Sequence, residues 1–168
     1  MKGVMVGAQA NNPLTRNRSH LECRALGPDL IEALSEFFRS VRSSGEYEFF
    51  HPHEFEHADA ERLCNYVGQD FYSVLVDRKR VIGYGMLRGW DEGYSVPSLG
   101  ICVNLTARGK GLGAFFMHYL HEVARHRGAV SVRLKVDKRN LAARRLYDNL
   151  GYSVHQETEE DFIMLKSL

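Results

Sequence analysis

Apolar residues recur along the chain at two spacings, of three to four residues in some segments and of two in others. The clearest helical segment is 112–123, where one stripe collects Leu112, Phe115, Phe116, Tyr119, Leu120 and Val123. This spacing is typical of a helix with one buried face. Further helices are predicted over 28–41, 57–67 and 140–150. Gly128 and Gly151 follow two of these segments and are expected to end their helices.

Alternation of apolar and polar residues predicts the strands. In 130–136, the apolar residues Val130, Val132, Leu134 and Val136 alternate with polar ones, as in a strand with one buried face. Other strands are predicted over 20–26, 71–76, 81–87, 97–103, 152–155 and 162–165. Residues 77–79, Asp-Arg-Lys, predict a tight hairpin turn between two of them. The order predicts an α/β domain with a mixed sheet, in which an antiparallel meander precedes one βαβ unit.

Composition restricts the classes of protein that this chain can be. Its 168 residues suit one domain, expected over 20–168 behind a flexible tail at 1–19. A formal net charge of +1 argues against binding to nucleic acid, and no apolar run approaches the ~18 residues of a membrane span. Three widely spaced cysteines without a CxxC pair predict neither disulfides nor a metal site. The N-terminus makes a poor signal peptide, so we expect a cytoplasmic protein.

Positive charge is nevertheless concentrated in one region. Between Arg108 and Arg145, ten Lys or Arg residues stand against two acids. There the segment 98–113, SLGICVNLTARGKGLG, leads a predicted strand through a glycine-rich turn into the longest helix. Glycines let backbone N–H groups converge, and the helix N-terminus adds unpaired donors and the positive end of its dipole. Such a turn predicts a phosphate site, with a glycine-rich connector that binds no ligand as the alternative.

Two general phosphate-binding motifs fit this turn less well. Gly111 follows Lys110, where a P-loop requires Ser or Thr. Gly109, Gly111 and Ala114 match the dinucleotide fingerprint, and Asp137 closes the next predicted strand. However, five residues separate the preceding strand from the first glycine, and only 31 residues follow Asp137. These are too few for the remaining parallel strands of a dinucleotide-binding sheet, so we treat the match as fortuitous.

A third pattern in the turn, Arg108-x-x-Gly111-x-Gly113, resembles the acyl-CoA pyrophosphate-binding motif of the GNAT superfamily of N-acyltransferases. A second segment, 140–152, resembles the later motif of that superfamily, N-x-x-A-x-x-L-Y-x-x-x-G-F/Y. Its positions are filled by Asn140, Ala143, Leu146, Tyr147, Gly151 and Tyr152. The motifs stand in the order of the family, one helix and one strand apart, and the resemblance covers about 81–165.

The resemblance implies a GNAT-like fold whose central strands, here 99–103 and 130–136, splay apart to admit the pantetheine arm of acetyl-CoA. Backbone groups of the splayed strand and of the glycine turn would bind this acyl donor, and an N–H within 101–103 would stabilise the oxyanion. The implied donor-binding residues are Ile101, Cys102, Val103, Arg108, Gly109, Lys110, Gly111, Leu112, Gly113, Asn140 and Tyr147. For Asn140, capping of its helix is the alternative role.

The implied reaction is attack of a neutral amine on the thioester. In the family, the tyrosine at the position of Tyr147 is frequently the general acid, and a phenol with a pKa of about 10 is protonated at neutral pH. Packing in the core is the alternative for Tyr147. Some members carry a glutamate before the glycine turn, but 98–101 contain none. His53 and His51 are the candidates for the general base, and a purely structural role in the core or on the surface is the alternative for each. A water chain or an already deprotonated amine could replace a base.

The family places its acceptor pocket near the first helices and the hairpin loop. The candidate substrate-binding residues are therefore Tyr47, Glu48, Trp90 and Asp91, with a role in the turn as the alternative for Asp91. Their acidic and aromatic character suits the cationic amine of a small molecule such as an amino sugar. A protein N-terminus or lysine is the alternative acceptor, and a non-catalytic acyl-CoA sensor is an alternative of another class. The oligomeric state stays open, a homodimer included.

Overall fold

The computed structural model describes residues 20–45 and 48–168, so the N-terminal segment 1–19 lies outside the described residues. Seven strands form one sheet in the order β1-β2-β3-β4-β5-β7-β6. The strands are β1 (Leu21–Ala25), β2 (Phe71–Asp77), β3 (Arg80–Arg88), β4 (Ser98–Val103), β5 (Ser131–Asp137), β6 (Ser153–Glu157) and β7 (Asp161–Ser167). The helices are α1 (Ile31–Ser43), α2 (His57–Cys64), α3 (Leu112–His126) and α4 (Leu141–Asn149), with 3-10 turns at Pro28–Leu30 and Leu105–Ala107. The predicted α/β class and mixed sheet are confirmed.

The first four strands form the predicted antiparallel meander. The hairpin between β2 and β3 turns through Arg78 and Lys79, both with positive φ, at 49° and 75°. Two such residues in succession make the type of turn whose twist matches that of the flanking strands. The tight turn predicted at 77–79 is therefore present.

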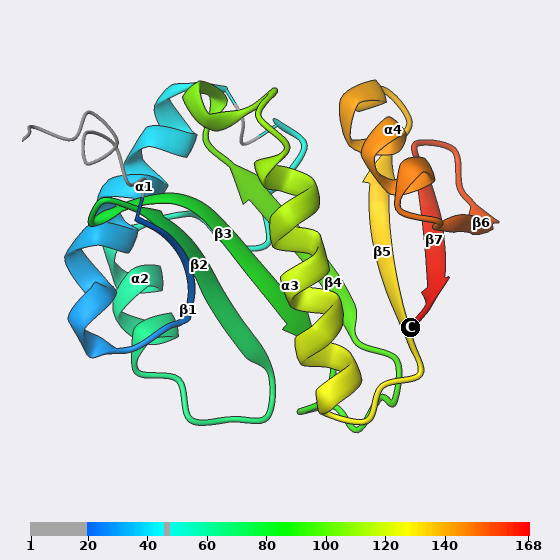
Figure 1. Ribbon diagram of the computed structural model, residues 1–168, viewed down its shortest axis with the longest axis horizontal. Coiled ribbons are helices and arrows are strands. Elements are labelled where there is room, and N and C mark those ends of the chain that lie inside the picture. Colours follow the sequence, from blue (N-terminus) through cyan, green and yellow to red (C-terminus); the bar gives the residue numbers. More distant parts are fainter. Residues whose placement is uncertain (1–19, 46–47) are drawn as a thin grey trace, which may run out of the picture.

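The two central strands separate along their length. β4 and β5 run parallel, and within the described residues one pair, Ser98 and Arg133, joins them. The Arg133 N–H donates to the Pro97 carbonyl at 3.0 Å at this same end. From there β4 and β5 diverge toward their carboxyl ends, while the other edge of β5 pairs with β7 along its whole length (Figure 1). The splayed strand pair implied by the resemblance is confirmed.

Helix α3 packs closely against β3 because two residues there have no side chain. A Cβ on Gly85 would lie 2.8 Å from Phe116 Cζ of α3, and one on Gly83 would lie 3.5 Å from Phe116 Cδ1. The buried face of α3 comprises Phe116, Met117, Leu120, His121 and Ala124. It is rotated from the predicted stripe, and Phe115 is 46% exposed. The glycines draw the Phe116 side of the helix onto the sheet, which the helix sequence alone did not indicate.

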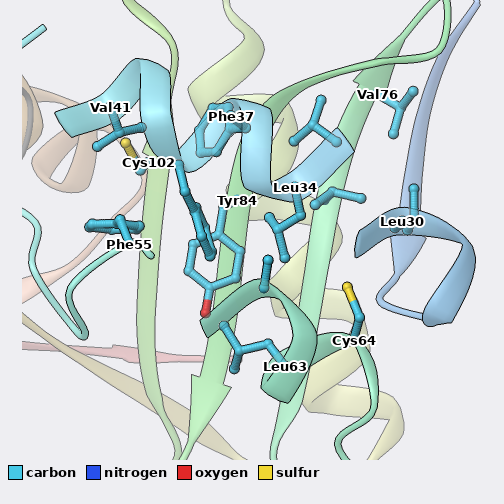
Figure 2. Packing of buried hydrophobic residues seen from close by; sticks show 14 residues of the cluster. Leu30, Leu34, Phe37, Val41, Phe55, Leu63, Cys64, Val76, Tyr84 and Cys102 are labelled. Atoms are coloured by element: carbon cyan, nitrogen blue, oxygen red, sulfur yellow. The ribbon is translucent and has the colours of Figure 1, made fainter. Parts of the chain in front are cut away.

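Helices α1 and α2 cover the other face of the sheet. Tyr84 projects from β3 into their core, where its ring lies 5.3 Å from that of Phe38 and 6.5 Å from that of Phe55 (Figure 2). Helix α2 ends at Cys64 rather than at the predicted Val67, which is 97% exposed. The Asn65 side chain donates to the Glu61 carbonyl at 2.8 Å and closes the last turn early. None of the helices in the described ranges is both long and apolar enough to cross a bilayer.

Candidate active site

The glycine turn forms an open cradle at the start of α3. Gly109 and Gly111 have φ of 73° and 75°, and a Cβ on either would meet no atom within 4 Å. The space beside both backbones is therefore open, and the free N–H groups of the first turn of α3 begin at Leu112. Arg108 and Lys110 hold the turn from within, since Arg108 Nε donates to the Val103 carbonyl at 3.0 Å and Lys110 Nζ to the Thr106 carbonyl at 2.9 Å. This geometry fits a phosphate group approached by backbone donors.

In the described part of the chain, the edge of β4 that faces β5 has no strand partner beyond Ser98. The Asn104 N–H donates to the Ile82 carbonyl of β3 at 2.9 Å, so Asn104 directs its polar groups toward β3. The Pro97 carbonyl accepts the Arg133 N–H of β5 at 3.0 Å, so Pro97 faces β5. Successive residues of a strand direct their polar groups to opposite sides, so Ile101 and Val103 direct their N–H groups toward β5. The pairing with β5 has ended there. Cys102, by contrast, turns its N–H toward β3 and its side chain into the core under α1 and α2.

Tyr147 lies on α4 and is 7% exposed. Its ring centroid is 5.7 Å from that of Tyr152, and it packs in the core that joins α3, α4 and β5. Burial, with a smaller contribution from the Cys102 thiol of β4, raises the pKa of Tyr147 to about 12. The phenol is thus protonated throughout the neutral range, as a general acid requires.

The entrance to α4 is fixed by two side-chain caps. Asn140 Oδ1 accepts the Ala143 N–H at 3.1 Å. The Asn140 side chain therefore caps α4, which is the alternative role considered for it. Asp137 binds Arg139 through both backbone and side chain, and this guanidinium lowers the pKa of the carboxyl. Asp137 lies at the end of β5 in a sheet whose neighbours are mostly antiparallel, which excludes the doubly wound sheet of the dinucleotide fingerprint.

The two candidate histidines lie in different surroundings. His53 packs against Phe38, Phe55 and Tyr84, and its Nε2 lies 3.4 Å from the Tyr84 hydroxyl. Burial outweighs the nearby Asp59 carboxylate and lowers the pKa of His53 to about 4. This core position favours a structural role for His53 over proton transfer. His51 is exposed on the loop before α2.

The candidate acceptor residues do not form one cluster. Trp90 turns toward α3, with the Arg127 guanidinium 5.1 Å from its ring centroid. Asp91 accepts the Gln69 N–H at 2.8 Å and binds the Tyr66 hydroxyl, so it organises the loop before β2. Glu48 pairs with Arg139 at 3.1 Å, at the end where β4 and β5 diverge. Tyr47 lies outside the described residues.

The sequence reasoning missed a pocket of about 540 Å³ on the face of the sheet opposite α3. Its floor is a row of three side chains from neighbouring strands, Arg88, Ser98 and Arg133, which the register places side by side. Met86 borders the pocket and pairs with Gly100, and a Cβ on Gly100 would lie 2.7 Å from Met86 Cε. The pocket therefore adjoins β4 at the closed end of the splay. Nothing in the spacing of these residues along the chain indicated that they meet.

The sequence profile of the Acetyltransferase (GNAT) family matches residues 28–152, which is most of the chain. The chain belongs to the GNAT acetyltransferase family. Membership makes it an acyltransferase, in agreement with the splayed strands and the open glycine turn. Among the described residues, no group of three or more His, Cys, Asp or Glu could hold a metal ion.

Curated relatives and solved structures show the same relationship. The chain is 28% identical over 118 residues to uncharacterized N-acetyltransferases of Mycobacterium tuberculosis and Mycobacterium bovis, covering 64% of this chain and 74% of theirs. Ribosomal-protein-S5-alanine acetyltransferase from Vibrio fischeri superposes with a TM-score of 0.77 at 16% identity, covering 90% and 97%. An aminoglycoside acetyltransferase in complex with coenzyme A and kanamycin superposes with a TM-score of 0.67 at 16% identity, covering 88% and 94%. At these identities the structural likeness shows the fold alone.

Proposed function

We propose that this GNAT enzyme transfers an acetyl group from acetyl-CoA to the primary amine of a small molecule. The observation that carries the proposal is that β4 and β5 diverge beside the open glycine cradle. The elements around this divergence supply three features: the open cradle at Gly109 and Gly111, the N–H groups of β4 beyond its bridge to β5, and the buried phenol of Tyr147 on α4. A diphosphate, an amide-bearing arm and a thioester would meet these features in that order.

In the proposed reaction, the amine nitrogen forms a bond to the thioester carbon and the carbon–sulfur bond breaks. The Ile101 or Val103 N–H would stabilise the negative charge that develops on the carbonyl oxygen. The nitrogen loses a proton to solvent, Tyr147 gives its phenolic proton to the departing sulfur, and the phenolate then takes a proton back from solvent. A thiol in water has a pKa of about 8.5, well below that of Tyr147, but burial raises the pKa of a thiolate as well and reduces this difference. The amine enters in its neutral form, and no histidine is assigned as the base.

Two acceptor classes are distinguished by the shape of the site. The pocket beside β4 has a volume of about 540 Å³, which is the size of sites for small ligands, and this favours a small amine over a protein N-terminus or lysine. An amino sugar is the first acceptor class to test. A reducing, cytoplasmic location is part of the proposal, because the three cysteines are widely spaced in the sequence and form no CxxC pair.

The proposal is tested by calorimetric titration with acetyl-CoA, with NADH as the control ligand. We expect saturable binding of acetyl-CoA and none of NADH. An amine panel read by release of the CoA thiol then follows, with amino sugars and an N-terminal peptide side by side. Turnover of the peptide alone would contradict a small-molecule acceptor. Binding of acetyl-CoA without turnover of any amine would favour a sensor over an enzyme that acts on amines.

A further inference from the structure

The pocket opposite α3 contains two arginines, which a site for a simple cationic amine would not need. Its floor carries two guanidinium groups, from Arg88 on β3 and Arg133 on β5, on either side of Ser98 on β4. Neighbouring strands lie about 4.8 Å apart, so the Cα atoms of the two arginines are roughly 10 Å apart. Two arginine side chains at this distance can converge on one group between them.

The charge of these arginines is only partly neutralised by the protein. Arg88 Nε lies 4.0 Å from Asp70 Oδ2, but Asp70 Oδ1 already accepts the N–H groups of Gly89 and Trp90 at 2.8 and 2.9 Å. In the described part of the chain, the Arg133 guanidinium makes no hydrogen bond or ion pair. Glu92 contributes one carboxylate to the lining. Within the lining, two guanidinium groups therefore face one carboxylate, and Arg133 keeps planar donors that no described side chain occupies and that suit an oxyanion.

The loop that carries Glu92 is held in place, so the pocket is a built feature of the fold. Asp70 is 7% exposed and binds three successive N–H groups at 89–91, which fixes the turn after β3. The Tyr94 N–H donates to the Gly89 carbonyl at 2.9 Å and brings Tyr94 to the rim. The position of this loop therefore depends on backbone hydrogen bonds and on Asp70, not on the side chains of Arg88 and Arg133.

We propose that Arg88 and Arg133 bind an anionic group, a carboxylate or a phosphate, on the amine acceptor. This inference rests on the proposed function and names the acceptor class as amines that carry a negative charge. Ser98 precedes Ile101 by three residues, and a strand rises about 3.3 Å per residue. The anion is therefore bound roughly 10 Å along β4 from the proposed oxyanion donor. Acceptors with several bonds between amine and anion fit this distance.

Matched acceptor pairs test the proposal. Glucosamine 6-phosphate is compared with glucosamine, and 5-aminopentanoate with 5-aminopentanamide, by kcat/KM for thiol release. We expect the charged member of at least one pair to be preferred by about tenfold or more, because hydrogen bonds to charged groups are the stronger ones. Which pair shows the preference distinguishes a phosphate from a carboxylate. Equal values in both pairs, or a preference for the uncharged members, would overturn the proposal.

Variants connect the preference to the pocket. Arg133→Gln is expected to abolish most of the preference by raising KM for the charged acceptor, and Arg133→Lys to restore part of it. Arg80→Gln is the matched control, because Arg80 is an exposed arginine at the other end of β3. A preference that survives Arg133→Gln would show that the anion is bound elsewhere.

A binding measurement keeps this inference separate from the proposed function. If acetyl-CoA binds but no amine is acetylated, the CoA-bound protein is titrated with glucosamine 6-phosphate while the amide resonances of Gly89 and Ser98 are followed. Saturable shifts that are lost in Arg133→Gln would support the anion site even though the proposed acetyl transfer had failed. Absence of such shifts would overturn the anion site itself.

Discussion

Arg139 Nη1 lies 3.1 Å from Glu48 Oε1, and this ion pair joins the segment between α1 and α2 to the turn between β5 and α4. The same guanidinium lies 5.4 Å from the ring centroid of Phe49 and binds Asp137 Oδ2 through Nη2 at 2.7 Å. These contacts cross from one half of the sheet to the other at the end where β4 and β5 diverge. Because both side chains of the pair are more than half exposed, we expect the pair to position the loop and to add little stability.

Glu48→Gln tests this role. The free energy of unfolding should change by less than about 0.5 kcal/mol, as for other exposed pairs. KM for the amine acceptor should rise roughly two- to fivefold, equivalent to at most about 1 kcal/mol, because the loop is less often in place. Glu32→Gln on the exposed face of α1 is the control. An unchanged KM would mean that the ion pair has no part in acceptor binding.

Gly111→Val tests the cradle. A side chain at φ 75° is strained by about 1–2 kcal/mol, and it would also occupy the open space beside the N-terminus of α3. We expect the Kd for acetyl-CoA to rise by on the order of tenfold or more, measured by calorimetry. Gly128→Val is the matched control, since Gly128 has φ 88° and equally open surroundings at the other end of α3. Equal affinities of the two variants would contradict this placement of the diphosphate.

Tyr147→Phe tests the general acid. Removal of the phenolic proton should slow acyl transfer by on the order of a hundredfold in a chemistry-limited assay and leave acetyl-CoA affinity nearly unchanged. Tyr152→Phe serves as the control, because this substitution removes a neighbouring buried hydroxyl, which lies 2.8 Å from His121 Nε2. It should lower stability by about 1 kcal/mol and leave transfer intact. Transfer at the wild-type rate in Tyr147→Phe would assign the acid elsewhere.

His121 predicts how stability depends on pH. Burial, followed by the charge of Lys166, lowers the pKa of His121 to about 4 from a usual 6.5. Between pH 6.5 and 4, His121 gains a proton in the unfolded chain but not in the folded protein. The contribution of His121 to the free energy of unfolding is therefore complete above pH 6.5 and is lost as the pH falls toward 4. Since such shifts translate only partly into stability, we expect a loss on the order of 1–2 kcal/mol.

The measurement is urea unfolding at pH 7.5, 6 and 5. His121→Gln should unfold with a smaller pH dependence than the wild type over this range. His118→Gln is the control, because His118 is exposed on the same helix. If His121→Gln keeps the full pH dependence, the acid sensitivity arises from other groups, of which buried His53 is the first to examine.

Local patterns were sufficient to predict most of the fold. The seven strands and the helix-ending glycines at 128 and 151 follow from periodicity and from the φ that glycine permits, and both glycines have positive φ. The cradle at 109–113 was also recognisable, because all of its chemistry lies within one turn of chain. To predict its position, it was enough to recognise a strand followed by a helix.

The residues of the acceptor pocket could not be predicted from local sequence patterns. Arg88 and Arg133 are separated in the chain by a loop, β4, the glycine turn and α3, and only the register of three strands brings them into one row. Asp91 was an acceptor candidate because of its place in the loop, with a turn role as the alternative, and its carboxylate accepts hydrogen bonds from the Tyr66 hydroxyl and the Gln69 N–H. His53 carries a suitable group for a base, but the aromatic residues that bury it come from α1, β3 and its own loop. Sequence spacing does not report on contacts of this kind.

The single pair between Ser98 and Arg133 has a consequence for the lifetime of the protein. With so little backbone bonding between its two halves, the folded state gains stability from whatever occupies the opening, by an amount that grows with the logarithm of the ligand concentration. A ligand at a hundred times its Kd would add about 2.7 kcal/mol. The resistance of this enzyme to heat and proteolysis would then follow the supply of its acyl donor, so that the amount of enzyme rises and falls with the availability of its own substrate.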